Sequence, residues 1–295
     1  MMQSIFTATL GRNGSQNLVD IFNRFGIDCF AEHEPPDLPL RQLGFRPFFR
    51  KRGWFGPGSK LALLGRNWQR RLFAPDELVG RGEALRWVEE GNTAQLAQLA
   101  NRRVRRLQRI AARGYLHYLE AGPYFLRTYG HQVFERVPDL GIIKLTRDPL
   151  TNAKSFVNRQ KDPWKTSLPP DRNGNILRLT DWQKLSEFQL YLHLWFETEL
   201  KFADFVERHA VKKVFKLKTP DLSDPNRISA MFHYFGIDHR PLKDLRPSNT
   251  AQEHGKEATL VTAALVEEYH RFLALVPPAL LDRIEFLRDY VPRVA

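Results

Sequence analysis

Short apolar runs alternate with stretches of helical spacing along most of the chain. Residues 5–10 are apolar and β-branched enough for a buried strand, and residues 17–25 carry apolar positions at helical spacing. Residues 27–31 predict a second strand. A strand, a glycine turn, a helix and a strand in this order form a βαβ unit. Such a unit predicts a parallel sheet with helices on its faces.

The remaining pattern extends this α/β arrangement over the whole chain. It predicts strands at residues 124–128, 140–146 and 214–217, and helices at residues 83–120, 149–158, 182–208, 226–235 and again after 258. Residues 35–82 are irregular and rich in Pro, Gly, Arg and aromatic side chains. With neither a repeat nor a low-complexity linker, we predict one three-layer α/β/α domain with a central parallel sheet. It carries a largely helical insertion at about residues 36–120.

Composition excludes several classes of protein. Of the 295 residues, 42% are hydrophobic and 12% aromatic, which supports a sizeable core. The single cysteine, Cys29, excludes an intramolecular disulfide framework and a cysteine-rich metal site. The amino terminus lacks the features of a secretory signal, and no run approaches the ~20 apolar residues that span a bilayer. We therefore expect a cytoplasmic protein.

The charge is unevenly distributed. The chain has 45 Lys and Arg against 33 Asp and Glu, a net charge of +12. Residues 41–113 hold 17 of the basic and 5 of the acidic residues, so this stretch carries the whole surplus. A basic surface of this kind attracts nucleic acid, anionic lipid or a small anionic substrate.

The turn after the first predicted strand has the features of an anion-binding loop. Gly11 and Gly14 permit a tight turn, and the amides that follow lie at a helix amino terminus, where the helix dipole favours an anion. The side chains at the same place are hydrogen-bond donors: Arg12, Asn13, Ser15, Gln16 and Asn17. Gly14 stands where a Walker A motif requires Lys. An ordinary turn with Ser15 as the N-cap is the alternative interpretation.

A second candidate segment follows the strand predicted at residues 140–146. Arg147 leaves the carboxyl end of this strand in an Arg-Asp-Pro sequence, and Ser155 follows eight residues later on the next helix. Ligands of open parallel sheets bind at the carboxyl ends of the strands. We therefore expect Arg147 and the glycine turn to lie at the same edge of the sheet.

Together the two segments resemble the sulfotransferase superfamily that uses 3′-phosphoadenosine 5′-phosphosulfate (PAPS). Residues 12–18 match a Lys/Arg-x-Gly-Ser/Thr-x-x-Leu loop, and residues 147–155 match Arg-Asp/Asn-Pro-x-x-x-Ala-x-Ser. The resemblance covers about residues 3–34 and 124–237 and implies a P-loop-NTPase-like sulfotransferase fold. It implies that residues 12–17 hold the 5′-phosphosulfate and that Arg147 and Ser155 hold the 3′-phosphate. The product would be 3′-phosphoadenosine 5′-phosphate (PAP), and this scheme requires no metal.

The resemblance also suggests catalytic roles. Arg12 would stabilise the charge that develops on the bridging oxygen as the sulfuryl group leaves. The first candidate for the general base is Glu32 or Glu34, which follow the second strand. His131 is the next candidate and His33 the last. In an extended segment Glu32 and Glu34 share one face and His33 lies on the other. Solvated residues at strand ends are the alternative interpretation for each of them.

The leading functional hypothesis is transfer of a sulfuryl group to a hydroxyl of a carbohydrate, a glycolipid or another polar metabolite. The basic stretch would then select an acidic or phosphate-bearing acceptor, or make peripheral contact with an anionic membrane. A nucleic-acid-binding protein that stacks bases on the aromatic residues between 45 and 68 is one alternative, although we expect no nucleic-acid partner. A P-loop kinase is another. The missing Walker Lys weighs against it.

Overall fold

The structure, a computed structural model, describes residues 2–33, 83–137, 139–158, 164, 167–245 and 260–294. Glu34, a candidate base, lies outside the described residues, as do residues 41–82 of the basic stretch. Within the described part of the chain, no helix is long and apolar enough to cross a membrane.

The described chain forms an α/β fold around one parallel sheet. The sheet has five strands in the order β2-β3-β1-β4-β5, and all neighbouring pairs are parallel. The strands are β1 (Gln3–Ala8), β2 (Cys29–His33), β3 (His117–Ala121), β4 (Gly141–Thr146) and β5 (Val214–Lys218). This confirms the predicted three-layer architecture with a central parallel sheet.

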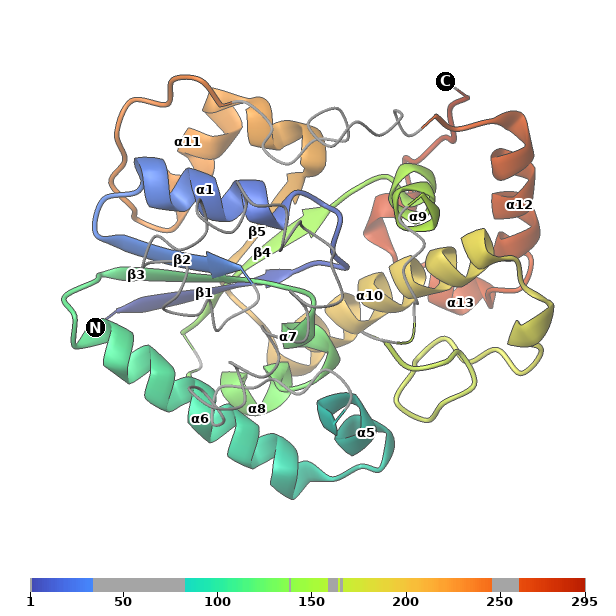
Figure 1. Cartoon of the computed structure of the whole chain (residues 1–295), viewed down its shortest axis with the longest axis horizontal. Helices are drawn as coiled ribbons and strands as arrows, with labels where there is room; N and C mark the ends of the chain where they lie inside the picture. Colours follow the sequence, from blue (N-terminus) through green and yellow to red (C-terminus); the bar gives the residue numbers. More distant parts are fainter. Residues whose placement is uncertain are drawn as a thin grey trace, which may run out of the picture.

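Helices cover both faces of the sheet (Figure 1). The α-helices are α1 (Ser15–Phe25), α5 (Glu83–Glu89), α6 (Thr93–Ala111), α7 (Tyr124–Arg127), α8 (Gly130–Phe134), α9 (Pro149–Val157), α10 (Glu187–His209), α11 (Pro225–Tyr234), α12 (Ala263–Leu273) and α13 (Pro278–Leu281). Short 3₁₀ helices are η3 (Trp182–Lys184), η4 (Thr219–Ser223) and η6 (Glu285–Leu287). Helices α1 and α11 lie on one face, and α6, α7 and α8 lie on the other.

Each face of the sheet has its own hydrophobic core. On the α1 side, Leu18 and Phe22 pack with Phe232 of α11 against the sheet. On the other side, Phe6 and Phe125 stack with ring centroids 4.5 Å apart. β1 and β4, in the middle of the sheet, are buried along almost their whole length, as is typical of parallel strands covered on both faces.

The third strand differs from the prediction. The sequence pattern predicts a helix to residue 120 and a strand at 124–128, whereas residues 112–114 form a turn, His117–Ala121 forms β3, and Tyr124–Arg127 forms a helical turn. Tyr115 and Tyr118 continue the helical spacing of α6, which misled the prediction. Gly114 ends it, with a φ of 89° that a helix excludes. Because β3 lies between β2 and β1, the inserted part of the chain ends before His117.

The strand order places the two candidate segments side by side. β1 is the central strand, with β3 on one side and β4 on the other, so the direction in which the chain winds reverses at β1. Ligand crevices of open α/β sheets form at such a point, outside the carboxyl ends of the strands. The glycine turn follows β1, and Arg147 follows β4. We refer to this side of the sheet as the carboxyl edge.

Candidate active site

The glycine turn has a backbone conformation that favours glycine. Gly14, directly before α1, has a φ of 91°, and a Cβ on it would lie 2.5 Å from Cδ1 of Leu222. α1 begins at Ser15 and has no acidic residue in its first turn. Its first amides have no partners within the helix, and no carboxylate there competes for them. The carboxyl edge therefore presents an uncompensated helix amino terminus, which suits an anion.

Asn13 fixes this turn from within. Its side chain is 2% exposed, and its amide nitrogen donates to Oγ1 of Thr9 and to the carbonyl of Leu145, both at 2.9 Å. Asn152 of α9 donates to the carbonyl of Gly11 at 3.0 Å and to Oδ1 of Asn13. The sequence predicts Asn13 as a ligand donor, but its side chain holds the loop in place. The sequence analysis did not predict a role for Asn152. The signal that could have indicated one is its polar side chain within α9.

Arg147 joins the second segment to the first. Its Nη1 donates to the backbone carbonyl of Arg12 at 3.2 Å, and its Nε donates to Oγ1 of Thr151 at 3.1 Å. The indole Nε1 of Trp195 in α10 donates to the backbone carbonyl of Arg147 at 2.9 Å. Burial lowers the pKa of Arg147, and Asp148 acts in the opposite direction. An arginine nonetheless keeps its charge at neutral pH. Two segments 135 residues apart in the sequence thus meet at one cation.

The other predicted donor-binding residues lie on α1 and α9. Ser15 and Asn17 are mostly buried at the start of α1, and Gln16 donates to Oδ1 of Asp20 at 3.1 Å. Ser155 lies on α9 and is 8% exposed. Asp148 caps α9 by accepting from the amide of Thr151 at 2.8 Å. This cap fixes the start of the helix that carries Ser155.

His33 is the candidate base that the structure brings to the glycine turn. Its Nε2 lies 2.9 Å from Oγ of Ser15, which joins the last residue of β2 to the first residue of α1. The resemblance places His33 below Glu32 among the candidate bases. Side chains alternate along a strand, so only one of these two neighbours can face α1.

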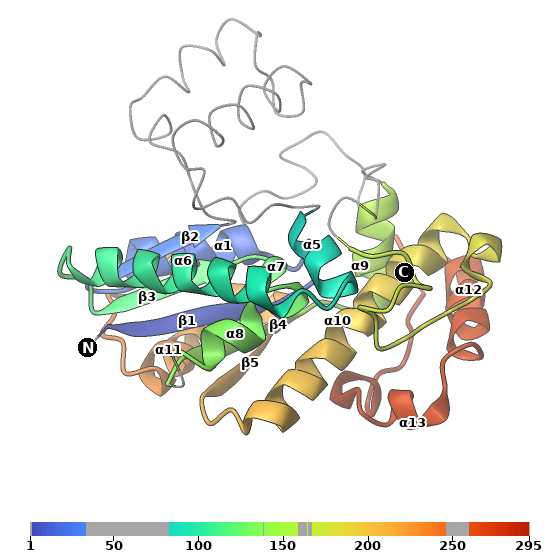
Figure 2. The same ribbon diagram turned by 90° about the horizontal axis from the view of Figure 1, so that it is seen from below.

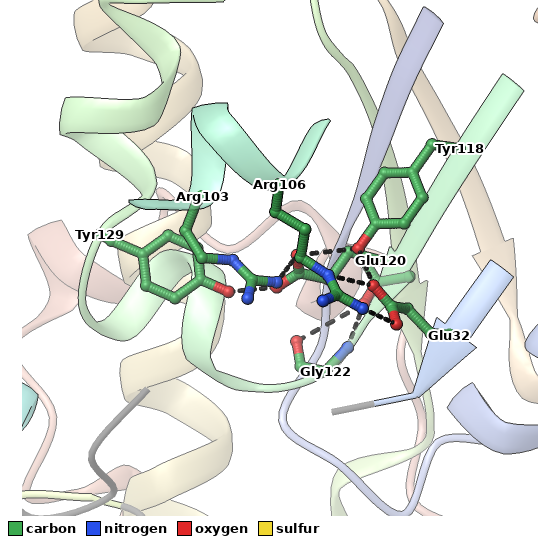
Figure 3. A network of polar contacts seen from close by, with 8 residues as sticks. Glu32, Arg103, Arg106, Tyr118, Glu120, Gly122 and Tyr129 are labelled. Carbon is green, nitrogen blue, oxygen red and sulfur yellow. Dashed lines mark hydrogen bonds and ion pairs between the residues drawn. The ribbon is translucent and has the colours of Figure 1, made fainter. Parts of the chain in front are cut away.

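Glu32 lies on the opposite side of β2 and is already bonded (Figure 3). Its side chain is 3% exposed, and Arg106 of α6 binds both carboxylate oxygens, with Nε 2.8 Å from Oε1. The hydroxyl of Tyr118 donates to Oε1 at 2.6 Å. Burial, followed by the charge of Glu32, raises the pKa of Tyr118 well above its usual value, so this hydroxyl remains a donor. Glu32 is thus part of an internal network.

The same network holds a second carboxylate. Glu120 of β3 lies beside Glu32 in the register of the sheet, and two adjacent buried carboxylates repel each other. Arg103 of α6 forms an ion pair with Glu120, and the Tyr129 hydroxyl donates to it. Burial disfavours the charge on Arg103, but Glu120 together with Tyr129 and Tyr118 outweighs burial, and the pKa of Arg103 is raised. Two arginines of α6 therefore balance two carboxylates at the ends of β2 and β3 (Figure 3).

His131 lies away from the carboxyl edge. Its Nδ1 is 2.8 Å from Nε2 of His209, the last residue of α10, and its ring packs on Phe205. The chain passes from His209 directly to the start of β5, at the opposite edge of the sheet. Burial, followed by the charges of His209 and Arg208, lowers the pKa of His131 to about 4. Of the candidate bases, the structure therefore brings His33, and not His131, to the glycine turn.

Comparisons with known proteins add little to this geometry. No family model matches the sequence. No curated protein matches it either. Among solved structures, a similar chain is the sulfotransferase domain of the olefin synthase from Synechococcus PCC 7002, with 15% sequence identity and a TM-score of 0.47. The match covers 99% of this chain and 96% of that one. At this level of similarity, function has to be inferred from the residues of the chain itself.

Proposed function

We propose that the chain is a sulfotransferase that moves a sulfuryl group from PAPS to a hydroxyl of a carbohydrate, a glycolipid or another polar metabolite. The contact between Arg147 and the Arg12 carbonyl is the observation that carries this proposal. It joins the two segments that the resemblance assigns to opposite ends of one bisphosphorylated nucleotide. A ligand with two separated anionic groups fits an edge with a helix amino terminus at one end and a half-buried arginine at the other.

The residues of the edge suit the parts of such a donor. The amides of α1 and the hydroxyl of Ser15 would hold the 5′-phosphate, with no acidic residue in the first turn to oppose it. Arg147 and Ser155 would hold the 3′-phosphate. The Arg147 guanidinium has a hydroxyl and a carbonyl as its hydrogen-bond partners. Because these partners are neutral, the positive charge of Arg147 can still attract an anionic ligand.

Transfer of the sulfuryl group depends on positioning and on charge neutralisation more than on covalent chemistry by the protein. When bound, the donor supplies the sulfuryl group and leaves as PAP. The side chain of Arg12 would stabilise negative charge on the oxygen of the leaving phosphate. His33, held 2.9 Å from Ser15, would take the proton of the acceptor hydroxyl. Glu34 and His131 remain predictions of the resemblance as alternative bases.

Nucleotide binding tests the donor assignment. We expect PAP to bind more tightly than adenosine 5′-phosphate, because Arg147 and Ser155 recognise the 3′-phosphate. In Arg147→Ala this preference should fall about 10-fold to 100-fold, the value of a charge-assisted contact of ~1.5–3 kcal/mol. Calorimetric titration of both nucleotides measures it. Arg86→Ala, a matched change on α5, is the control. Equal affinity of the wild type for the two nucleotides would overturn the proposal.

Kinetics of single variants test the base. We expect His33→Asn to lower kcat about 100-fold or more while leaving the affinity for PAP within about threefold, as for the loss of a general base. Glu32→Gln should instead reduce the free energy of unfolding. A wild-type kcat in His33→Asn, with a large loss of kcat in a folded Glu32→Gln, would transfer the role of base to Glu32.

A further inference from the structure

Helix α6 carries five arginines and no acidic residue. At about 100° per residue, these arginines divide between two faces of the helix. Arg103 and Arg106 face the sheet and pair with Glu120 and Glu32. Arg102, Arg105 and Arg109 lie on the adjacent, outer face of the helix. The inner pair is neutralised, so the charge that no described carboxylate balances belongs to Arg102 and Arg105 on the outer face.

The outer face borders a cavity. Its volume is about 470 Å³, and Arg102, Arg105, Gln108, Arg109 and Ala112 line it on the described side. This volume lies within the range of small-molecule sites. Within the described chain, neither Arg102 nor Arg105 forms an ion pair with a carboxylate, whereas Arg86 on α5 pairs with Glu90 at 3.4 Å. Two guanidinium groups on the wall of the cavity, those of Arg102 and Arg105, therefore have no acidic partner among the described residues.

This cavity is separate from the candidate active site. α6 runs antiparallel to β3: Arg103 is opposite Glu120 near the end of β3, and the helix ends at Ala111, shortly before β3 begins. Its last turn lies beside the amino terminus of the chain in both views (Figures 1 and 2). The cavity therefore runs along the outer side of α6 from the level of Glu120 toward the amino edge of the sheet, and its described lining includes neither the glycine turn nor Arg147.

We propose that the outer face of α6 is a second anion site, which binds a phosphate or sulfate ester independently of sulfuryl transfer. The planar guanidinium groups of Arg102 and Arg105 match the oxygens of a tetrahedral oxyanion, to which arginine donates pairs of parallel hydrogen bonds. Gln108 supplies an amide for a hydroxyl of the group that carries the ester. The ester belongs either to a soluble molecule or to a lipid headgroup, and the chemistry of recognition is the same for both.

Titration with inorganic pyrophosphate tests the site. It is performed in an Arg147→Ala background, which weakens anion binding at the carboxyl edge. We expect saturable binding that Arg102→Gln/Arg105→Gln weakens about tenfold or more and that high ionic strength also weakens. Arg86→Gln/Arg208→Gln removes the same charge outside the cavity lining and should change the affinity less than about twofold. Absence of saturable binding, or equal weakening by both double variants, would overturn the proposal.

Co-sedimentation with phosphatidylcholine vesicles, with and without phosphatidic acid, separates the two sources of the ester. Binding to the phosphatidic acid vesicles alone, lost in Arg102→Gln/Arg105→Gln, identifies a lipid headgroup. Pyrophosphate binding without vesicle binding identifies a soluble ester. Neither result depends on sulfuryl transfer, so an inactive enzyme with intact pyrophosphate binding would contradict only the proposed function.

Discussion

Arg103 is buried and Arg147 is half-buried, and the surroundings of these two arginines differ. Arg103 is 2% exposed and forms an ion pair with Glu120 within the network between α6 and the sheet. Arg147, at the carboxyl edge, donates to the hydroxyl of Thr151 and to the carbonyl of Arg12. The first charge is balanced by an ion pair inside the protein, whereas the hydrogen-bond partners of the second are neutral and the neighbouring Asp148 offsets its charge only in part. A cation balanced by a buried carboxylate serves the fold, and one held by neutral groups remains attractive to an anionic ligand.

The comparison explains why two arginine-rich regions need not share a function. Burying a charge costs several kcal/mol unless a partner offsets it. In the internal network, Arg106 and Arg103 offset the repulsion between Glu32 and Glu120 in neighbouring strands. At the carboxyl edge, Arg147 forms no ion pair within the described chain, and the neighbouring Asp148 offsets only part of the cost of burying its charge. A bound anion would offset the rest.

The largest expected effect concerns the balanced charge. Arg103→Met should lower the free energy of unfolding by about 3–5 kcal/mol, because it leaves Glu120 buried without its cation. Urea denaturation measures this. Arg103→Met/Glu120→Gln removes both charges and should recover part of the loss. A single variant as stable as the wild type would mean that the network does not hold β2 and β3 together.

The next effect concerns the charge held by neutral groups. Arg147→Met should change the free energy of unfolding by less than about 1 kcal/mol, since only neutral hydrogen bonds are lost. The same variant should weaken PAP binding by about 1.5–3 kcal/mol. Denaturation and calorimetry on one preparation measure both quantities. A loss of stability as large as that of Arg103→Met, without a loss of PAP affinity, would remove the distinction between the two arginines.

His131 gives a pH-dependent test of a buried group away from the edge. Its pKa of about 4 lies below the 6.5 of an unfolded chain, so the unfolded state binds more protons between these values. Stability should therefore fall as the pH drops from 7 toward 4. One pKa unit is worth ~1.4 kcal/mol, and screening at the partly exposed ring reduces the total to about 2 kcal/mol.

Comparison with His131→Gln isolates this contribution, because burial also lowers the pKa values of His117, His193 and His209. The variant should show a shallower decline of unfolding free energy with acid and an unchanged kcat at pH 7. A strongly reduced kcat in a stable variant would instead support His131 as the base.

The smallest effect is expected on the outer face of α6. Arg102→Gln should change the free energy of unfolding by less than about 0.5 kcal/mol, since Arg102 has no ion pair in the described chain. Arg103→Met, one residue further along, is the matched contrast. Similar losses in both variants, measured by urea denaturation, would show that the two faces of the helix do not differ as the structure indicates.

Sequence patterns predicted most of the sheet because buried parallel strands and their turns leave local signals. β1, β4 and β5 coincide closely with predicted strands, and the glycine turn and Arg147 follow the strands from which they were expected to extend. The prediction for the region of β3 was wrong, because the spacing of Tyr115 and Tyr118 continues the helical spacing of α6. Gly114 was the available local signal, and the pairing of β3 with β1 and β2 is decided only by the sheet.

The sequence by itself determined the parallel α/β architecture, the two segments that are candidates for anion binding and the location of the positive surplus. Local periodicity and glycine placement encode these features, because they depend on residues close together in the chain. Only the tertiary structure decided that Asn13 fixes the loop, that His33 contacts Ser15 while Glu32 meets Arg106, and that His131 lies at the other edge. These roles depend on partners far away in the sequence, and the identity of a residue does not state which partner the fold brings to it.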